Sequence, residues 1–414
     1  MAKKKKKKQA AAEDYTPLRD EALPYAVWGE EYIEEGSHAQ MTGAMRLPIT
    51  VAGALMPDAH IGYGLPIGGV LATEGAVIPY AVGVDIACRM RISIFEESFI
   101  LMGQQPGRFE KALTEQTRFG AGSTFDRYDR SEHAVMDDPA WEATRQLKSL
   151  KDKGYAQLGT SGSGNHFVEW GEFDLLADDD ALGLKQGKYM ALLSHSGSRG
   201  VGYSLANYYS DVAKHMHYLE KSVEHLGWLP LDTEIGQEYW LSMELAGRYA
   251  AANHEVIHQR VSKAAGIKPV VTVENHHNFA WKETYVDAEG NEHEVVVHRK
   301  GATPAGKGVM GIIPGSMGDA GYVVRGRGEM RSINSASHGA GRTMSRRQAK
   351  QNITLSAQKK YLKERGVKLI GGDLDEAPQA YKNIEDVIAA QRDLVDIVGT
   401  FSPRVVRMDG GKKR

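Results

Sequence analysis

The sequence predicts a mixed fold of strands and helices, in which polar loops at strand ends build one site. Three observations support this prediction. Short apolar segments typical of buried strands recur along the 414 residues. Nearly all of them end in a cluster of Gly, Ser, His and Asn. No internal repeat and no linker rich in Pro or Ser interrupts the chain, so nothing marks a domain boundary.

The predicted elements follow one another along the chain. The segments 47–56 and 69–78 are expected to be buried strands, separated by the glycine-rich DAHIGYGLPIGG. Residues 105–157 are polar and charged, typical of a helical excursion on the surface, and 187–196 predicts a buried strand that runs into a polar turn. The other predictions are a long helix at 236–266 with apolar residues at three-and-four spacing, short strands within 269–275, 293–301 and 308–318, and a helix at 382–399.

The composition is that of an ordinary globular protein, with 42% hydrophobic and 25% charged residues. No run approaches the roughly 18 apolar residues of a membrane helix. The basic start MAKKKKKKQAAAEDY lacks the apolar region of a secretory signal, and the chain has one cysteine, so we expect a cytoplasmic protein without membrane contact.

The charge is unevenly distributed. The net charge is −2, but six of the positive charges are Lys3 to Lys8, so the remainder carries −8. A polyanion must therefore be held by a local basic site and not by a general positive field. Residues 1–15 are expected to form a disordered, solvated basic tail; the alternative is that this tail helps to bind a nucleic acid by counterion release.

The strand-end clusters share glycines and small hydroxyl residues, which let the backbone approach a ligand and point N–H groups at oxyanions. Histidine, asparagine and arginine beside them can supply metal ligands and phosphate contacts. One such cluster is an ordinary turn, but several at strand ends predict a single site assembled from the whole chain. The clusters are GTSGSGNHF, SHSGSRGVG, ENHHNF, HRKGATPAG, IPGSMG and NSASHGAGRTMSRR.

These clusters contain a candidate metal site. A lone cysteine such as Cys88 is most often a small buried hydrophobe, and a single histidine is usually a hydrogen-bonded core or surface residue. Together, a carboxylate, a thiolate and imidazoles suit Mn, Fe, Co or Zn better than Mg or Ca, and a thiolate can bridge two ions. The candidate ligands are Asp85, Cys88, His166, His195 and the pair His276/His277.

A competing pattern lies in the predicted long helix. His254-Glu-Val-Ile-His258 fits the H-E-x-x-H pattern of zinc proteases, with Glu274 as a conceivable third ligand. The metzincin continuation with a third histidine is absent. The preferred interpretation is a helix that carries two polar histidines.

The order of the motifs resembles the RtcB family of GTP-dependent RNA ligases, which join an RNA 3′-phosphate or 2′,3′-cyclic phosphate to a 5′-hydroxyl. The resemblance covers roughly residues 45–400 and implies one catalytic domain with an α+β fold, here 16–408, followed by a short basic tail at 409–414. The motifs are DAHIGYGLPIGGV, GVDIACRM, GTSGSGNHFVEW, SHSGSRG, HHNFAW, HRKGAT, IPGSMG, SASHGAGRTMSR and DEAPQAYKNIEDVI.

The resemblance also implies a role for each matching residue. His338 of SASHGAGR would be the nucleophile that takes GMP from GTP as a phosphoramidate. Two Mn²⁺ ions would be bound by Asp85, Cys88, His166, His195 and His277, with Cys88 as the bridge. The implied GTP contacts are Asn165, Phe167, Glu169, Asn278, Pro314, Gly315, Ser316, Met317, Gly339, Ala340, Gly341, Tyr381 and Arg407. The implied RNA phosphate contacts are Arg199, Lys300, Arg342 and Arg346.

The chemistry of these residue types agrees with those roles. A neutral imidazole attacks phosphorus when metals and arginines neutralise the phosphate charge. Glu169 can accept hydrogen bonds from the N1–H and amino group of guanine, which adenine cannot reproduce. The spacing of Arg342 and Arg346, four and eight residues after His338, would keep both on one helical face.

Some positions depart from the family pattern. Ala87 and Arg89 stand where glycines are usual, and Pro304 where an arginine is usual. A hydroxyl residue is replaced by Gly321, and the C-terminal Val-Lys-Gly is replaced by VVRMDGGKKR, with Arg407 as the substitute for its lysine.

The resemblance implies RNA repair or tRNA splicing as the process, with archease as a possible activating partner. The alternatives are a non-catalytic paralogue that binds RNA ends and a metal-dependent cyclic phosphodiesterase.

Overall fold

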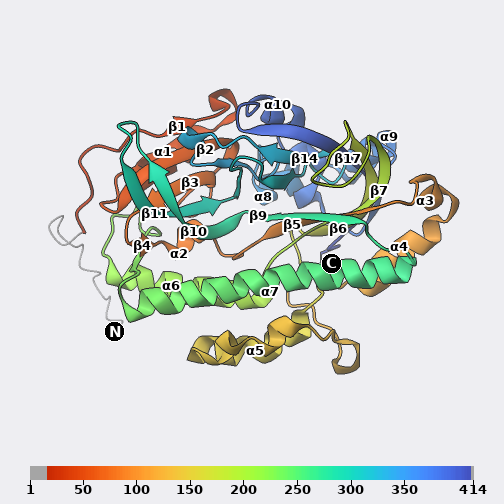
Figure 1. Cartoon of the computed structure of the whole chain (residues 1–414), viewed down its shortest axis with the longest axis horizontal. Coiled ribbons are helices and arrows are strands. Elements are labelled where there is room, and N and C mark those ends of the chain that lie inside the picture. Colours follow the sequence, from red (N-terminus) through yellow and green to blue (C-terminus); the bar gives the residue numbers. More distant parts are fainter. Residues whose placement is uncertain (1–15, 412–414) are drawn as a thin grey trace, which may run out of the picture.

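The computed structural model describes residues 16–411 (Figure 1), so the predicted tail 1–15 and residues 412–414 lie outside the described part. The strands form two main sheets and two short pairs. The strands are β1 (Ala26–Val27), β2 (Thr50–His60), β3 (Ile67–Thr73), β4 (Ala76–Val77), β5 (Arg89–Phe95), β6 (Phe167–Leu175), β7 (Gly187–Ser196), β8 (Leu229–Pro230), β9 (Val271–His276), β10 (Asn278–Val286), β11 (Glu292–Lys300), β12 (Ala302–Pro304), β13 (Met310–Ile313), β14 (Gly321–Gly326), β15 (Ser335–Ser337), β16 (Lys368–Ile370) and β17 (Val395–Met408).

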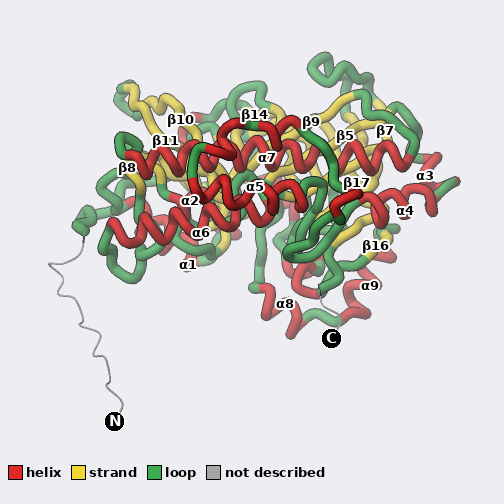
Figure 2. The backbone as a smooth tube through the Cα atoms, turned by 90° about the horizontal axis from the view of Figure 1, so that it is seen from below, coloured by secondary structure: helices red, strands yellow, loops and turns green. Residues whose placement is uncertain are grey.

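The helices surround these sheets, so the α+β class with mixed sheets and outer helices is confirmed. Figure 1 and Figure 2 show α6 and α7 side by side across one face of the strands, with α5 packed on the outer side of this layer. The α-helices are α1 (Glu35–Met45), α2 (Pro79–Val82), α3 (Ile100–Gln104), α4 (Pro106–Gln116), α5 (Arg145–Gln157), α6 (Arg199–Met216), α7 (Glu234–Ala265), α8 (Arg346–Asn352), α9 (Leu355–Glu364) and α10 (Ile384–Ala389).

The predicted long helix is confirmed as α7. Its ends follow from local chemistry: the Thr233 hydroxyl accepts a hydrogen bond from the Gly236 N–H, and Gly266 ends the helix in the left-handed region at φ 64°. The inner face of α7 packs on the α6 side of the core through residues such as Tyr239, Met243 and Tyr249. The helix α7 therefore packs along one face of the larger sheet.

The larger sheet has the order β13-β14-β17-β6-β7-β5-β9, with β16 paired to β17. The predicted strand 187–196 is confirmed as β7, which lies between β6 and β5. Its successive residues Leu192, Leu193 and Ser194 are all buried, because both faces of the strand are covered. The second sheet has the order β1-β2-β3-β11-β10.

The loop that connects β2 and β3 is shorter than the glycine-rich segment DAHIGYGLPIGG predicted to form it. β2 continues to His60, where it pairs with Ile67 at the start of β3. Asp58 therefore lies within a strand, and only residues 61–66 form the connecting loop. The segment 69–78, predicted as one strand, is divided into β3 and β4 by a turn at Glu74 and Gly75.

The predicted helix at 382–399 is confirmed only in its first part and is wrong beyond Ala389. The helix α10 ends at Ala389, and the residues from Val395 to Met408 form β17, which pairs with β6 and β14. Gly399 and Pro403 disfavour a helix, and the register of β17 shifts between Pro403 and Val405, where the missing proline N–H costs little. Pairing within the sheet thus overrode the helical spacing of the apolar residues.

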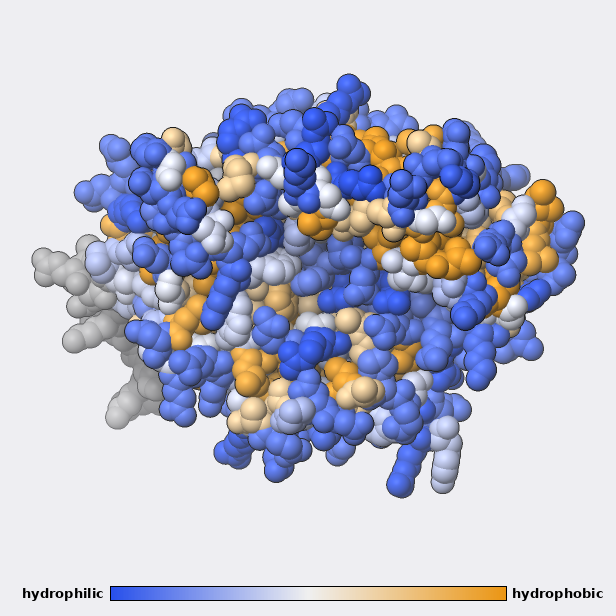
Figure 3. All heavy atoms as spheres, viewed as in Figure 1, coloured by the Kyte–Doolittle hydropathy of each residue, from blue (hydrophilic) through white to orange (hydrophobic). Residues whose placement is uncertain are grey.

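The surface carries no sign of a membrane span. Among residues 16–411, no helix combines the length and apolar character that crossing a bilayer requires. Figure 3 shows that the face in view is mostly hydrophilic, with apolar side chains in small separate groups.

Candidate active site

A cavity of about 1040 Å³ collects most of the residues that the sequence singled out. Asp85, Cys88, His166, His195 and His277 line it, and so does His338. These residues come from segments separated by up to some 250 positions in the sequence. The cavity is therefore the site that the strand-end loops were expected to build.

The register of the larger sheet explains this convergence. His195, in β7, pairs with Phe167, the residue directly after His166. Arg89, the residue after Cys88, pairs with Ser196 on one side and with His276, the residue before His277, on the other. The four ligand candidates therefore lie at the same edge of neighbouring strands.

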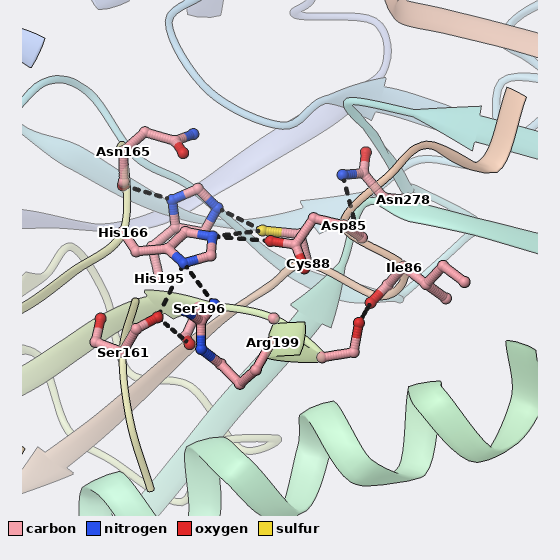
Figure 4. A network of polar contacts seen from close by, with 12 residues as sticks. Asp85, Ile86, Cys88, Ser161, Asn165, His166, His195, Ser196, Arg199 and Asn278 are labelled. Carbon is pink, nitrogen blue, oxygen red and sulfur yellow. Dashed lines mark hydrogen bonds and ion pairs between the residues drawn. The ribbon is translucent and has the colours of Figure 1, made fainter. Parts of the chain in front are cut away.

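The side chains of this cluster approach one another closely (Figure 4). Cys88 Sγ lies 3.1 Å from His195 Nε2 and 3.4 Å from His166 Nε2. His166 Nε2 also lies 3.0 Å from Asp85 Oδ2. His195 Nε2 lies 3.2 Å from His277 Nε2. The five side chains thus form one continuous group of potential ligand atoms.

Backbone carbonyls determine which nitrogen of two imidazoles carries the proton. His166 Nδ1 lies 2.9 Å from the Ser161 carbonyl, and His195 Nδ1 lies 3.0 Å from the Asn165 carbonyl. A carbonyl oxygen only accepts, so each Nδ1 carries the hydrogen and each Nε2 presents a lone pair to Cys88; Asp85 lies beside the Nε2 of His166 alone. Such a group of electron-pair donors is stabilised by a cation among them, which is the chemistry of a borderline divalent metal site.

The pKa values agree with a site built for metal. Burial lowers the pKa of His195 to about 3 and holds that of His277 well below its ordinary value, so both imidazoles are neutral at physiological pH. Burial, with Asp85 nearby, raises the pKa of Cys88 well above its ordinary value. A bound cation reverses that effect, because a coordinating thiol loses its proton.

The buried side-chain amide of Asn253 forms hydrogen bonds with the segments that carry the candidate ligands. Asn253 of α7 accepts a hydrogen bond from the Gly159 N–H (2.7 Å) and donates to the Thr160 carbonyl (3.0 Å) and to Ser196 Oγ (3.1 Å). Ser196 Oγ in turn donates to the Ser161 carbonyl, at 2.7 Å. Since that carbonyl orients His166, α7 fixes the metal cluster through Asn253 without touching it.

Next to the cluster, His338 is held by a carboxylate that sequence analysis missed. His338 Nδ1 lies 2.7 Å from Asp58 Oδ2, and the N–H groups of His338 and Gly339 donate to the same oxygen at 3.1 and 3.3 Å. The ring of His338 lies 4.8 Å from the ring of His277, measured between centroids. Among residues 16–411, the hydrogen bond of the His338 ring is made by Nδ1, which leaves Nε2 without a hydrogen-bond partner beside the Cys/His cluster.

Asp58 is fully buried, and its pKa shows how strongly it is tied to His338. Burial alone would raise this pKa, but the charge of His338 and their hydrogen bond outweigh it, so the pKa lies below its ordinary value. Its Oδ1 atom has no hydrogen-bond partner among residues 16–411. The first residue of DAHIGYG was the available signal, because a buried strand rarely carries an aspartate without a role.

Most of the candidate nucleotide contacts also line the cavity: Asn165, Phe167, Asn278, Pro314, Gly315, Ser316, Met317, Gly339, Ala340, Gly341 and Tyr381. Glu169 lies two residues beyond Phe167 on the same face of β6 and is buried. Its Oε2 has no hydrogen-bond partner in the described chain, and burial raises its pKa well above the ordinary value. A ligand with two adjacent N–H donors would satisfy this carboxyl group.

Arg407, unlike the other candidate nucleotide contacts, points away from the cavity. It pairs with Val168, so its side chain lies on the face of the sheet opposite to Phe167 and Glu169. Its guanidinium donates to the carbonyl of Ile370 at 3.1 Å and stacks over Phe119, 4.8 Å from the ring centroid. The neighbouring Met408 lines the cavity instead. The structure therefore keeps Arg407 away from the other nucleotide candidates.

Of the four candidate phosphate contacts, Lys300, Arg342 and Arg346 line the cavity and Arg199 does not. Arg199 reaches His166 Nδ1 at 3.2 Å. Arg342 lies before α8, not on it, so the expected common helical face is absent; it is fixed by Glu376 (3.0 Å) and by backbone carbonyls. Arg346 also pairs with Glu376, but its side chain is 55% exposed, which leaves it free to meet a ligand.

The fourth candidate, Lys300, is buried and lines the cavity. Its ammonium donates to the carbonyls of Tyr63 and Leu65, the latter at 3.0 Å. Burial lowers its pKa to about 7.

The departures near Cys88 have visible consequences. Ala87 adopts φ 57°, a conformation that strains a residue with a side chain and that glycine would adopt without strain. Arg89 is buried and pairs with Glu274 at 3.1 Å. Glu274 is thus engaged by arginine and is not a third ligand for the α7 histidines.

Those two histidines are buried, not exposed on the helix. His254 Nδ1 and His258 Nε2 both contact Ser194 Oγ, at 2.7 and 2.8 Å, and His258 Nδ1 contacts Ser93 Oγ at 2.8 Å. Ser194 and His195 are successive residues of β7, so they point to opposite faces of the sheet. Glu255 lies 3.1 Å from His133 near the surface. The H-E-x-x-H pattern therefore does not form a metal site.

Fold and site together describe an α+β protein with a Cys/His cluster able to hold a metal ion beside a carboxylate-bound histidine. The family model "tRNA-splicing ligase RtcB" matches residues 40–153 and 104–409. The chain belongs to the RtcB family.

Curated relatives are similar over most of their length. RNA-splicing ligase RtcB of Escherichia coli K12 is 31% identical over 94% of this chain and 98% of its own. tRNA-splicing ligase RtcB of Archaeoglobus fulgidus is 30% identical over 86% of this chain and 87% of its own. The corresponding protein of Thermococcus kodakarensis is 32% identical over 81% and 82%.

Proposed function

We propose that this protein is a GTP- and Mn²⁺-dependent RNA ligase that joins RNA 3′-phosphate or 2′,3′-cyclic phosphate ends to 5′-hydroxyl ends. One observation carries the proposal: His338 is tied through Nδ1 to the buried Asp58, and its ring lies 4.8 Å from that of His277 in the Cys/His cluster. An oriented nucleophile beside a metal site is what nucleotide transfer requires. The names of the relatives support the same reaction class.

Asp58 sets the chemistry of His338. Because Nδ1 donates its hydrogen to Asp58 Oδ2, the lone pair of the imidazole is at Nε2. Nε2 attacks the α-phosphorus of GTP, the P–N bond forms, and the bond to the β-phosphate oxygen breaks to release pyrophosphate. The carboxylate stabilises the positive charge that the imidazole gains, so Asp58 acts as a positioning and electrostatic residue.

Two Mn²⁺ ions would be held by Asp85, Cys88, His166, His195 and His277, of which Cys88, His166 and His195 have ligand atoms close enough to share one ion. When bound, these ions would neutralise charge on the reacting phosphates. Arg199 and Arg346 would hold the RNA phosphate, and Lys300 and Arg342 would add positive charge to the wall of the cavity.

A 2′,3′-cyclic end is first opened by water, which breaks the P–O2′ bond and leaves a 3′-phosphate. In the second stage an oxygen of the RNA 3′-phosphate attacks the GMP phosphorus on His338, and the P–N bond breaks. The RNA 5′-hydroxyl then attacks the RNA 3′-phosphorus, loses its proton and expels GMP. The products are a 3′,5′-phosphodiester and GMP, so pyrophosphate and GMP account for all of the GTP.

Guanine selectivity would come from Glu169. Its buried Oε2 has no hydrogen-bond partner in the described residues, which costs free energy in the absence of a ligand. The N1–H and amino group of guanine would each donate to this carboxyl group, whereas adenine presents an acceptor at N1. Phe167, on the same face of β6, would contact the base.

We also propose that residues 16–408 act as one ligase domain in RNA repair or tRNA splicing, with archease as a candidate activating partner. The proposed compartment is the cytoplasm, on the basis of the single free cysteine.

Incubation with α-labelled GTP and Mn²⁺ tests the proposal directly. The protein should acquire one covalent GMP, in a bond that is labile to acid and stable to alkali, as a phosphoramidate is. His338→Ala should lose the label and keep its metal. A wild-type protein that binds GTP and Mn²⁺ but is never labelled, with or without archease, would contradict the proposal in favour of an RNA-end binder or a cyclic phosphodiesterase.

A further inference from the structure

Tyr63 lies at the mouth of the cavity and is 70% exposed. Ile61, in the same loop between β2 and β3, is 53% exposed. Single exposed apolar side chains are ordinary on protein surfaces and mean little alone. Here, however, the two side chains border the cavity that contains His338, and the loop that carries them is unusually well fixed.

The backbone of this loop is bonded on both sides. The Gly62 N–H donates to Gln40 Oε1 at 3.0 Å, and the Gly62 carbonyl accepts from Gln40 Nε2 at 2.6 Å. The Ile61 N–H donates to Glu34 Oε1 at 2.9 Å. At the other end, Lys300 donates to the carbonyls of Tyr63 and Leu65. The phenol ring is therefore presented to solvent from a rigid backbone, at little entropic cost on binding.

The ring is also supported from one side. It meets His225 at an interplanar angle of 90° with 5.9 Å between centroids, and His225 contacts Tyr80 at 4.9 Å. Leu65 is fully buried beneath the loop, and a side chain at Gly64 would collide with Leu226. The contact with His225 leaves most of the Tyr63 ring open to a second flat partner.

The charge around the ring favours a polyanion over an apolar protein segment. Lys300 lines the cavity, and its amino group donates to the backbone carbonyls of Tyr63 and Leu65. Arg346 and Arg347 line the same cavity. Unstacked bases of single-stranded RNA bind by stacking on aromatic side chains while cations meet the backbone.

We infer that Tyr63, with Ile61 beside it, is a stacking platform for the base of a nucleotide at the reacting end of the RNA. The inference rests on the proposed ligase function and adds a subsite to it. The platform holds the base outside the cavity, so that the attached phosphate points inward to Lys300 and the metal cluster. It makes no contact with the guanine of GTP, whose candidate contacts lie around Phe167 and Glu169.

The test compares Tyr63→Ala with Tyr63→Phe and Tyr63→Trp in the full chain. Tyr128→Ala is the matched control, because Tyr128 is 98% exposed and does not line the cavity. Affinity for a fluorescent RNA with a 3′-phosphate, and for one with a 5′-hydroxyl, is measured by anisotropy in the presence of Mn²⁺. Labelling of His338 by α-labelled GTP is measured separately, so the first chemical step is scored independently.

Tyr63→Ala should weaken binding of one of these RNA ends by about 5- to 150-fold, as the loss of one base stack does. Tyr63→Phe, Tyr63→Trp and Tyr128→Ala should bind within about twofold of wild type, since the ring and not the hydroxyl is needed. Wild type should bind an RNA that lacks the terminal base more weakly than the intact RNA by the same factor. Tyr63→Ala should bind the intact and the abasic RNA with equal affinity. The RNA end whose affinity falls in both comparisons is the one that carries the stacked nucleotide.

Two results would overturn the platform. One is equal RNA affinity of Tyr63→Ala and Tyr128→Ala for both RNA ends. The other is a loss of GMP labelling in Tyr63→Ala that matches its loss of RNA binding, which would make Tyr63 a GTP contact. A wild-type protein that binds RNA but is never labelled contradicts the ligase proposal instead, and the binding comparison still decides the platform.

Discussion

Two groups of buried histidines lie on opposite faces of the same sheet and differ in the hydrogen-bond partners of their ring nitrogens. His166 and His195 donate from Nδ1 to backbone carbonyls, which leaves each Nε2 directed at Cys88. On the other face, both nitrogens of His258 contact serine hydroxyls, and His254 shares Ser194 with it. The first group directs lone pairs at a thiol, whereas the second has three of its four ring nitrogens on serine hydroxyls that join α7 to the sheet, with His254 Nε2 unpartnered among the described residues.

The partner of the second ring nitrogen, and not the spacing of histidines in the sequence, separates His166 and His195 from His258. A carbonyl can only accept, so it forces one tautomer on the imidazole. A hydroxyl both donates and accepts, so it leaves the tautomer open and satisfies the ring by itself.

The largest effect is expected for Cys88→Ser. Cys88 contacts both His166 and His195, and a serine hydroxyl does not supply an anionic soft ligand at neutral pH. Mn²⁺ affinity should fall by more than about 100-fold, since even the loss of an outer partner of a ligand costs up to that factor. Metal content measured by mass spectrometry and ligation assayed with GTP check this; wild-type values for both would refute the metal assignment.

Asp58→Asn should lower the rate of GMP labelling by about 10²- to 10⁴-fold, the range for losing the carboxylate behind a catalytic imidazole. The neutral amide no longer stabilises the charge that His338 gains on attack. Bound metal should equal that of wild type, because Asp58 contacts His338 and not the Cys/His cluster. An equal loss of metal would instead indicate that Asp58 supports the whole site.

Metal binding should release about one proton per chain near neutral pH. The raised pKa of Cys88 keeps its thiol protonated in the metal-free protein, whereas His195 and His277, with lowered pKa values, have no proton to lose. Mn²⁺ affinity should therefore rise with pH, by up to about tenfold per unit. Calorimetry in buffers of different ionisation enthalpy measures the released proton, and Cys88→Ser should release none.

The smallest effect on the metal is expected for His258→Ala. Removal of the ring leaves the hydroxyls of Ser93 and Ser194 short of a partner in the core, so the free energy of unfolding should fall by about 1–3 kcal/mol. The metal content should stay at the wild-type value. His166→Ala is the converse variant, with metal lost and the fold retained; a shared loss of metal in both variants would erase the distinction between the groups.

Much of this molecule could be predicted from its sequence. The apolar runs at 187–196 and 236–266 predicted β7 and α7, because burial on both faces and three-and-four spacing are local patterns. The strand β17 could not be predicted, since its pairing with β6 joins residues more than 200 positions apart. The opposite directions of Glu169 and Arg407 follow from that pairing as well.

In the candidate site, too, contacts between residues far apart in the sequence could not be predicted. Residue chemistry and motif order indicated Cys88 and the three histidines around it, which the structure brings together. Asp58 was missed because its partner His338 is 280 residues away. Arg342 and Arg346 were expected on one helical face, but α8 begins only at Arg346.

The central claim is that the strand-end cluster, and not the α7 pair, holds the metal. Anomalous diffraction from Mn²⁺-loaded crystals tests it most directly. The account predicts density in contact with Cys88 Sγ and the Nε2 atoms of His166, His195 and His277, and none beside α7. Density between His254 and His258, with the Cys88 cluster empty, would contradict it.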